Sequence, residues 1–349
     1  MKQFNVILPF CICIFLLSAC RLDKKNTEIQ LSGIHKVILL DSLSATKAIV
    51  KDDIDQFFDK IMPIDMMIQT KQVYPASMSR DSMVSAYKKF IQRDVCDFTP
   101  EESAFIAKTL SEAYNLCNQV SGSLFPEEIK IIKSHGKHYG EDTYYTRENL
   151  IIIPKQALAQ QDSEVFLKII LHEIAHIVTR LRPAMKAKLY AIIGFKKMDN
   201  ALIINDSLKH RLLTNPDGSD LNWTTELTMA NGKNAFTIPL IYANDSLYNP
   251  EKPDFFQNMG WNYFEITPSV SGTEFQVQTI GNQQKSTLNT TGLTALFKEK
   301  FNTDYIIHPD EIVADNFSIL IYSLKNPQSL DSLSTGGKLL IETIKGVLK

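Results

Sequence analysis

Three side chains that can support hydrolytic chemistry lie within five consecutive residues: His172, Glu173 and His176. On an α-helix, residues four apart lie one turn apart on the same face, so the two imidazole rings can converge on one Zn²⁺. Glu173 would lie beside that metal, as the general base does in an HExxH motif. The competing interpretation is a pair of hydrogen-bonded core histidines without a metal.

The segment that must position these side chains has the pattern of a buried helix. Ser163 can cap its N-terminus, and residues 164–171 are largely apolar and contain neither glycine nor proline. A helix that is apolar on most of its circumference is expected to be buried. Buried histidines and a buried glutamate need polar partners, which favours the metal interpretation.

A catalytic zinc usually has three protein ligands and one water molecule, so one more ligand is required. The candidate is Glu311, which lies four residues before Asp315 on a second expected buried helix beginning at Pro309. Asp315 can accept a hydrogen bond from the second ring nitrogen of a ligand histidine. Glu311 could instead be a capping residue of that helix. Other acidic residues that could supply the ligand are Glu226, Glu265 and Glu274.

An HExxH motif with a downstream Glu-x-x-x-Asp helix resembles the zinc site of gluzincin metallopeptidases, the thermolysin-like group. The resemblance implies that His172, His176 and Glu311 bind one zinc ion. It also implies that Glu173 is the general base and that Asp315 orients His172. The separation of 135 positions from His176 to Glu311 exceeds the few tens that are usual in this group, so a long insertion must separate the two helices.

Gluzincins also use a tyrosine or a histidine that donates a hydrogen bond to the oxyanion of the transition state. The sequence offers several such residues and does not distinguish among them. The candidates are Tyr144, Tyr145, His210, Tyr305 and His308.

The first residues have the pattern of a secretion signal. Lys2 gives a basic start, residues 6–17 form an apolar run, and Leu17-Ser18-Ala19-Cys20 resembles the lipobox of bacterial lipoproteins. The resemblance implies cleavage before Cys20, lipid on that cysteine, and a protein of the bacterial cell envelope that faces outside the cytoplasm. A plain secretory signal is the alternative. The sequence leaves open which membrane or leaflet would hold the anchor.

The composition indicates a globular protein, and the order of the expected helices and strands predicts an α+β fold. The 349 residues, 44% of them hydrophobic, can form a large core, and a formal net charge of −2 gives no reason to expect nucleic acid as a partner. We expect a mainly helical body with a small β-sheet before the HExxH helix. The expected order is a signal peptide (1–19), a lipidated N-terminus and tether (20–50), a helical region with the zinc-site sheet and helix (51–198), a β- and loop-rich insertion (199–286) and a C-terminal helical part with the third ligand (287–349).

Two further segments have recognisable patterns. Residues 149–154 are expected to form a strand before the HExxH helix. In the resembling enzymes an edge strand lies along the cleft and can pair with an extended substrate, although a purely structural strand fits these residues equally well. Asn215-Pro216-Asp217-Gly218 is typical of a turn between the short strands of the insertion.

These features predict a metallopeptidase with one Zn²⁺ per chain that hydrolyses peptide or protein substrates outside the cytoplasm, held at the membrane through lipidated Cys20. The second hypothesis is a surface-exposed binding lipoprotein whose zinc site is structural or vestigial. Zinc content, measured together with the dependence of hydrolysis on Glu173, distinguishes the two. The sequence indicates neither the cleavage specificity nor the oligomeric state.

Overall fold

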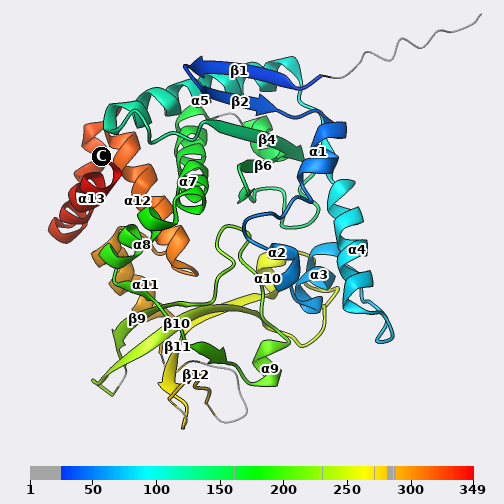
Figure 1. The fold of residues 1–349 in the computed structure, drawn as a ribbon, viewed down its shortest axis with the longest axis vertical. Helices are drawn as coiled ribbons and strands as arrows, with labels where there is room; N and C mark the ends of the chain where they lie inside the picture. Colours follow the sequence, from blue (N-terminus) through cyan, green and yellow to red (C-terminus); the bar gives the residue numbers. More distant parts are fainter. Residues whose placement is uncertain (1–24, 161, 230, 271, 281–285, 287) are drawn as a thin grey trace, which may run out of the picture.

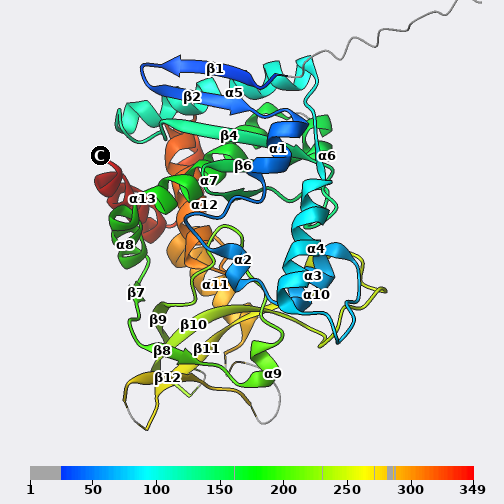
Figure 2. The same cartoon turned by 45° about the vertical axis from the view of Figure 1, so that its right-hand side comes forward.

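The computed structural model describes residues 25–160, 162–229, 231–270, 272–280, 286 and 288–349. Two six-stranded sheets lie at opposite ends of the molecule, with helices between and beside them (Figures 1 and 2). The expected α+β class is confirmed. The predicted signal peptide (1–19) and the predicted lipidation site, Cys20, lie outside the described residues. Among the described helices, none combines the length and the apolarity that crossing a membrane would require.

The first sheet is buried on both faces. Its strands follow the order β1 (Thr27–Ser32), β2 (His35–Leu39), β4 (Glu128–Ser134), β6 (Leu150–Pro154) and β5 (Tyr145–Arg147), and β3 (Val95–Cys96) pairs with β4. Ile131 and Ile151 contribute to the hydrophobic core on one face, and Ile132 and Ile152 contribute to the core on the other. Burial on both faces explains the continuous apolar run of β6, because neither set of alternating side chains contacts water.

The N-terminal segment is part of the folded body, so the prediction of a tether over residues 20–50 is wrong from Thr27 onwards. Strands β1 and β2 form one edge of the first sheet, and α1 (Ser42–Ala48) follows them. Val37 and Leu39 are buried. The edge strand β1 has largely exposed side chains and is therefore mostly polar, which removes the apolar run that identifies a strand in a sequence.

The strand expected over residues 149–154 is present as β6, and of the two roles left open for it, the structure excludes that of an edge strand. Strand β6 lies between β4 and β5, and the edge is formed by β5, which pairs with β6 in antiparallel orientation. At the centre of β5, the backbone N–H of Thr146 already donates a hydrogen bond to Oδ1 of Asp217 over 2.6 Å. This part of the edge is therefore occupied by the protein's own chain.

The HExxH segment lies in α7 (Ser163–Leu181), which follows β6 through the short helix α6 (Lys155–Gln160). The N-cap of α7 is Asp162 and not Ser163, because the Asp162 carboxylate accepts hydrogen bonds from the backbone N–H groups of Glu164 and Val165. Helix α7 packs against α5 (Pro100–Val120) and along α12 (Pro309–Ser323) (Figure 1). The expected second buried helix is therefore present, and it lies beside the first.

The remaining helices support the two flanks of the molecule. One group covers the other face of the first sheet, and Pro63 begins α3 shortly after the end of α2, because proline is favoured in the first turn of a helix. This group consists of α1, α2 (Phe57–Lys60), α3 (Pro63–Thr70) and α4 (Arg80–Gln92). The second group packs beside α12 and α7 and consists of α8 (Pro183–Ile192), α11 (Thr290–Phe301), η1 (Pro327–Leu330) and α13 (Thr335–Leu348).

The predicted insertion forms the second sheet, which has its own core of residues such as Ile238 and Phe264. The strand order is β7 (Phe195–Lys197), β9 (Trp223–Thr228), β10 (Asn234–Ala243), β11 (Met259–Pro268), β12 (Glu274–Val277) and β8 (Ala201–Ile203). Strand β7 precedes the expected boundary at residue 199. Two short helices, α9 (Asp206–Lys209) and α10 (Phe255–Asn258), flank the sheet. The loop between α9 and β9 leaves this sheet and contacts α7 and α12.

Candidate active site

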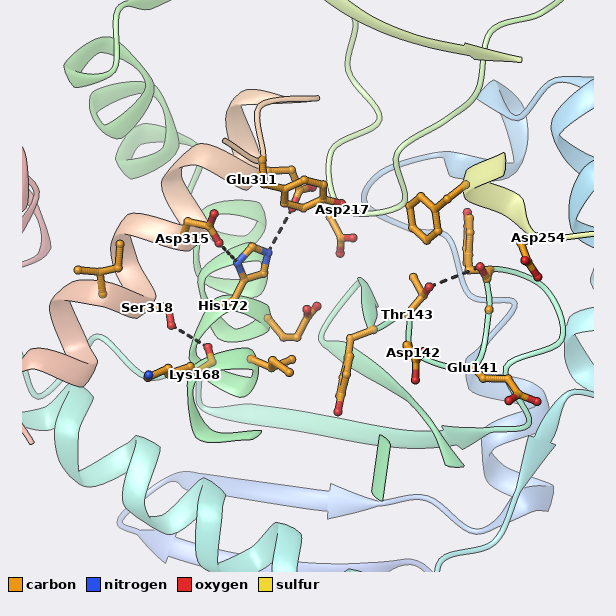
Figure 3. A pocket seen from close by; sticks show the side chains of 18 of the residues that line it. Glu141, Asp142, Thr143, Lys168, His172, Asp217, Asp254, Glu311, Asp315 and Ser318 are labelled. Carbon is orange, nitrogen blue, oxygen red and sulfur yellow. Dashed lines mark hydrogen bonds and ion pairs between the residues drawn. The ribbon is translucent and has the colours of Figure 1, made fainter. Parts of the chain in front are cut away.

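The structure brings His172, His176 and Glu311 together where α7 and α12 are in contact (Figure 3). Oε2 of Glu311 lies 3.2 Å from Nε2 of His172 and 3.5 Å from Nε2 of His176. One potential ligand atom from each residue lies within 4.8 Å of the other two. Two imidazole nitrogens and one carboxylate oxygen are a donor set that suits Zn²⁺. These three residues could therefore hold a metal ion.

The ring of His172 is oriented by Asp315. Nδ1 of His172 lies 2.8 Å from Oδ1 of Asp315, and the hydroxyl of Thr303 donates a hydrogen bond to the other carboxylate oxygen. We assign the ring proton to Nδ1, because only a protonated nitrogen can donate to the carboxylate. The lone pair of Nε2 is then directed toward Glu311, as a metal-binding histidine requires.

Glu311 is held in place from the opposite side. Its side chain is buried, and Nδ2 of Asn215 donates a hydrogen bond to Oε1 over 2.7 Å. The second oxygen, Oε2, is directed toward the histidines. The alternative role of Glu311 as a capping residue is not supported, because the side chain of the N-cap residue, His308, accepts the hydrogen bond from the backbone N–H of Asp310.

Glu173 lies beside the histidine–glutamate cluster and lines the adjoining pocket. Its side chain is almost fully buried, and its Oε2 has no hydrogen-bond partner among the residues that the structure describes. Burial, and next the negative charge of Asp217, raise the pKa of Glu173 to about 8. A carboxyl group with a pKa in this range can accept a proton and return it near neutral pH.

The other charges of the cluster compensate one another. Burial alone would lower the pKa of His172, but hydrogen bonds with Asp315 and Glu311 hold it well above its usual value. Burial also opposes protonation of His176, yet the charge of Glu311 raises its pKa. Burial would raise the pKa of Glu311, but the two histidines hold it well below its usual range. A metal ion would therefore compete with protons for both imidazole rings.

The pocket beside the cluster has a volume of about 970 Å³, enough for a peptide of several residues (Figure 3). One wall is formed by residues 139–144, which precede the edge strand β5. Lys168 and Ile169 of α7 and Ser318 and Ile319 of α12 line another part of the pocket. A substrate in this pocket would lie against His172 and Glu173.

Two of the five candidate oxyanion donors, Tyr144 and Tyr305, line this pocket. The ring of Tyr305 lies 6.4 Å from the ring of His172, measured between centroids. Burial, and next the charge of Glu173, raise the pKa of Tyr144 above its usual value. Its hydroxyl therefore stays protonated at neutral pH and can donate a hydrogen bond. The structure leaves both tyrosines as candidates.

The other three candidates lie elsewhere. Tyr145 is buried on the opposite side of the chain from the pocket, and its hydroxyl lies 2.8 Å from Nε2 of His138. Nδ1 of His210 lies 2.6 Å from the carbonyl oxygen of Asp206 in α9. His308 caps the N-terminus of α12. None of the three is among the described residues that line the pocket, so the sequence expectation is wrong for these three.

The alternative third ligands also lie away from the cluster. They lie on strands β9, β11 and β12 of the second sheet, and they are Glu226, Glu265 and Glu274.

Comparison of the chain with models of known protein families, with curated proteins and with solved structures finds no match in any of the three. The function is therefore inferred from the residues of the site and their geometry.

Two residues of the site, Asn215 and Asp217, were not identified from the sequence. Both belong to the loop between α9 and β9, where Asn215-Pro216-Asp217-Gly218 had been interpreted only as a turn. One potential ligand atom of Asp217 lies within 4.8 Å of such atoms in Glu173 and His176. Burial raises the pKa of Asp217, although the charge of His176 opposes this increase. In the sequence, these two residues are recognisable only as polar side chains of a turn. Their contact with α7 and α12 depends on the tertiary fold.

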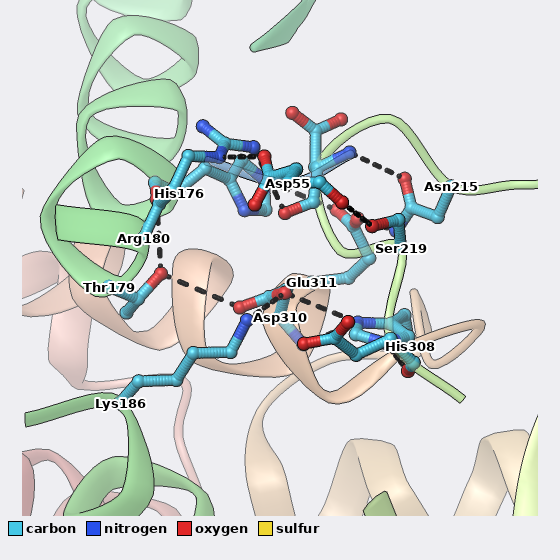
Figure 4. A network of polar contacts seen from close by, with 12 residues as sticks. Asp55, His176, Thr179, Arg180, Lys186, Asn215, Ser219, His308, Asp310 and Glu311 are labelled. Carbon is cyan, nitrogen blue, oxygen red and sulfur yellow. Dashed lines mark hydrogen bonds and ion pairs between the residues drawn. The ribbon is translucent and has the colours of Figure 1, made fainter. Parts of the chain in front are cut away.

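Arg180, one turn beyond the HExxH motif, holds this loop in place (Figure 4). Its guanidinium group donates hydrogen bonds to the carbonyl oxygens of Pro216 and Asp217, each over 3.3 Å, and it forms an ion pair with Asp55. The loop also passes so close to α12 that a Cβ at Gly218 would overlap with His308 and Asp310. A side chain at this position would displace the loop, so glycine is required here.

Proposed function

We propose that the protein is a zinc-dependent metallopeptidase of the gluzincin type. The observation that supports this proposal is the convergence of His172, His176 and Glu311, with Asp315 bonded to His172, next to a pocket that Glu173 lines. Two helices that are distant in the chain, α7 and α12, supply these residues. A pair of hydrogen-bonded core histidines would require neither the adjacent pocket nor the unpartnered oxygen of Glu173.

A bound zinc ion would polarise the substrate carbonyl and lower the pKa of a water molecule. Glu173 takes the proton from the attacking water and transfers it to the leaving amine. Asp315 maintains the protonation of His172 at Nδ1. The hydroxyl of Tyr144 or of Tyr305 donates a hydrogen bond to the oxyanion that develops at the carbonyl.

We further propose that the protein is a lipoprotein of the bacterial cell envelope, anchored through Cys20 and facing outside the cytoplasm. This proposal depends on the sequence pattern of residues 1–20. Its substrates would then be peptides or proteins outside the cytoplasm.

The first prediction concerns removal of the metal. We expect the purified chain to contain about one zinc ion, to hydrolyse peptides, to lose this activity with a chelator and to regain it when zinc is added. The measurements are metal content by mass spectrometry and hydrolysis of a broad peptide panel. One zinc ion per chain without hydrolysis of any peptide would favour the binding lipoprotein instead.

The second prediction concerns Asp315. In Asp315→Asn the amide cannot provide the negative charge that stabilises the Nδ1 proton of His172, so we expect zinc affinity to fall by about 10- to 100-fold. The measurement is competition with a zinc chelator of known affinity. Asp304→Asn is the matched control, because Asp304 is an exposed residue that forms an ion pair with Lys298. Equal zinc affinities in the Asp315 and Asp304 variants would contradict the assigned role of Asp315.

A further inference from the structure

Charge is distributed unevenly along the pocket. In Figure 3, Lys168 and Ser318 lie on one side of His172, whereas Asp217, Asp142 and other carboxylates lie on the opposite side. Lys168 is the only lysine or arginine among the described residues that line the pocket. The half of the pocket that contains Asp217 is therefore acidic, and it would attract a positively charged part of a substrate.

Within this half, Asp217 is fixed by the surrounding protein. Its Oδ1 accepts hydrogen bonds from the backbone N–H and from the hydroxyl of Thr146, both over 2.6 Å. Its backbone N–H donates to Oδ1 of Asn215, and its carbonyl oxygen accepts from Arg180. No described residue donates a hydrogen bond to Oδ2, so this oxygen can accept one from a substrate.

Asp217 is also close to the reacting groups. One oxygen of its carboxylate lies within 4.8 Å of a carboxylate oxygen of Glu173 and of a ring nitrogen of His176. The unpartnered and buried Oε2 of Glu173 is a second acceptor at the same place. Burying two carboxylates is costly, and Arg180, which donates to the carbonyl oxygen of Asp217, offsets this cost only in part, so a positively charged group of a substrate would be favoured here.

Substrate geometry indicates which groups can reach Asp217. In a residue whose carbonyl oxygen lies on the metal, the α-nitrogen is about 2.5 Å from the carbonyl carbon and within roughly 5 Å of the metal. An α-ammonium group at this distance is within reach of Asp217, a carboxylate oxygen of which lies within 4.8 Å of a ring nitrogen of His176. The ammonium group of a lysine side chain near the scissile bond offers the same chemistry.

We propose that Asp217 binds an ammonium group of the substrate next to the scissile bond and so makes the enzyme selective for peptides with a positive charge at that position. This inference rests on the proposed metallopeptidase function. Asp217 would then determine substrate specificity. The resemblance to gluzincins assigns no role to this residue.

The test uses four peptides in which the N-terminal residue directly precedes the scissile bond. This residue is either lysine or the uncharged norleucine, and its α-amine is either free or acetylated. We expect the wild-type protein to cleave the charged member of at least one matched pair about 10- to 100-fold faster in kcat/KM. In Asp217→Asn this preference should disappear, so that the charged and the uncharged member of each matched pair are cleaved with similar kcat/KM.

The two comparisons identify the source of the ammonium group. A preference for the free over the acetylated N-terminus that requires Asp217 assigns the α-amine, and a preference for lysine over norleucine that requires Asp217 assigns the side chain.

The control is Glu226→Gln, which removes an exposed carboxylate on β9 of the second sheet and should keep the wild-type preference. Identical preferences in wild type and Asp217→Asn would overturn the inference.

Two further measurements keep this inference separate from the proposed function. Zinc content should be unchanged in Asp217→Asn, and its loss would overturn the inference because Asp217 would then be a metal ligand. Calorimetric binding of the same peptides to Glu173→Gln, with and without Asp217→Asn, reports charge preference without turnover. If no peptide is hydrolysed by wild type, the proposed function fails. If peptides are hydrolysed or bound without any charge preference, only the role of Asp217 fails.

Discussion

Replacement of Glu173 by glutamine is expected to lower kcat for peptide hydrolysis by about 10²- to 10⁴-fold while zinc remains bound at the wild-type level. Glutamine has nearly the same size as glutamate but cannot accept a proton from the attacking water. The metal should be retained, because Glu173 is not one of the three proposed ligands. These are His172, His176 and Glu311, whose potential ligand atoms lie close together. The measurements are steady-state hydrolysis of a peptide and metal content of the same sample.

The control for this variant is Glu164→Gln. Glu164 lies in the first turn of the same helix, where it is about half exposed and bonded to Tyr322 and Lys325. Its replacement should leave kcat close to that of wild type. Activity of Glu173→Gln above about one tenth of the wild-type value would contradict the general-base role of Glu173.

The second large effect is expected at Glu311. Glu311→Ala removes the proposed third ligand and leaves Asn215 without its hydrogen-bond acceptor, so we expect zinc affinity to fall by more than about 100-fold. Glu311→Gln should have a similar effect on zinc. Glutamine can still accept the hydrogen bond from Asn215, so this variant separates loss of the ligand from loss of local structure. The measurements are zinc content after dialysis and chelator competition.

Two variants of the second sheet provide the comparison for Glu311. Glu265→Ala and Glu274→Ala remove carboxylates of β11 and β12, and both should retain zinc. Zinc content that is unchanged in Glu311→Ala, or lost in either control, would show that the third ligand has been assigned incorrectly.

The parts of the site that could be predicted from sequence are those encoded locally in helices. The spacing of His172 and His176 fixes their relative position on α7, and the spacing of Glu311 and Asp315 does the same on α12. Both helices are also recognisable because their apolar residues recur with helical periodicity and because Pro309 marks the start of α12. The resemblance to gluzincins then suggested that the two helices would pack together.

The parts that could not be predicted depend on contacts between distant segments. Nothing in the turn around Asn215 indicates that it folds back onto α7, because its anchors, Arg180 and Thr146, lie more than thirty residues earlier. The strands β1 and β2 were missed for a different reason. At a sheet edge few side chains are buried, so polar residues are tolerated and the sequence pattern is weak.

The long separation between α7 and α12 determines when this site can form. His172 and Glu173 are synthesised more than a hundred residues before Glu311, and the second sheet lies between them in the chain. Closing so long a segment costs conformational entropy before any contact between the two helices is gained, so their docking is expected to be a late event in folding. A nascent chain that ends before residue 311 contains Glu173 but lacks Glu311, the proposed third ligand. The proposed hydrolytic activity would therefore require a chain whose folding is nearly complete.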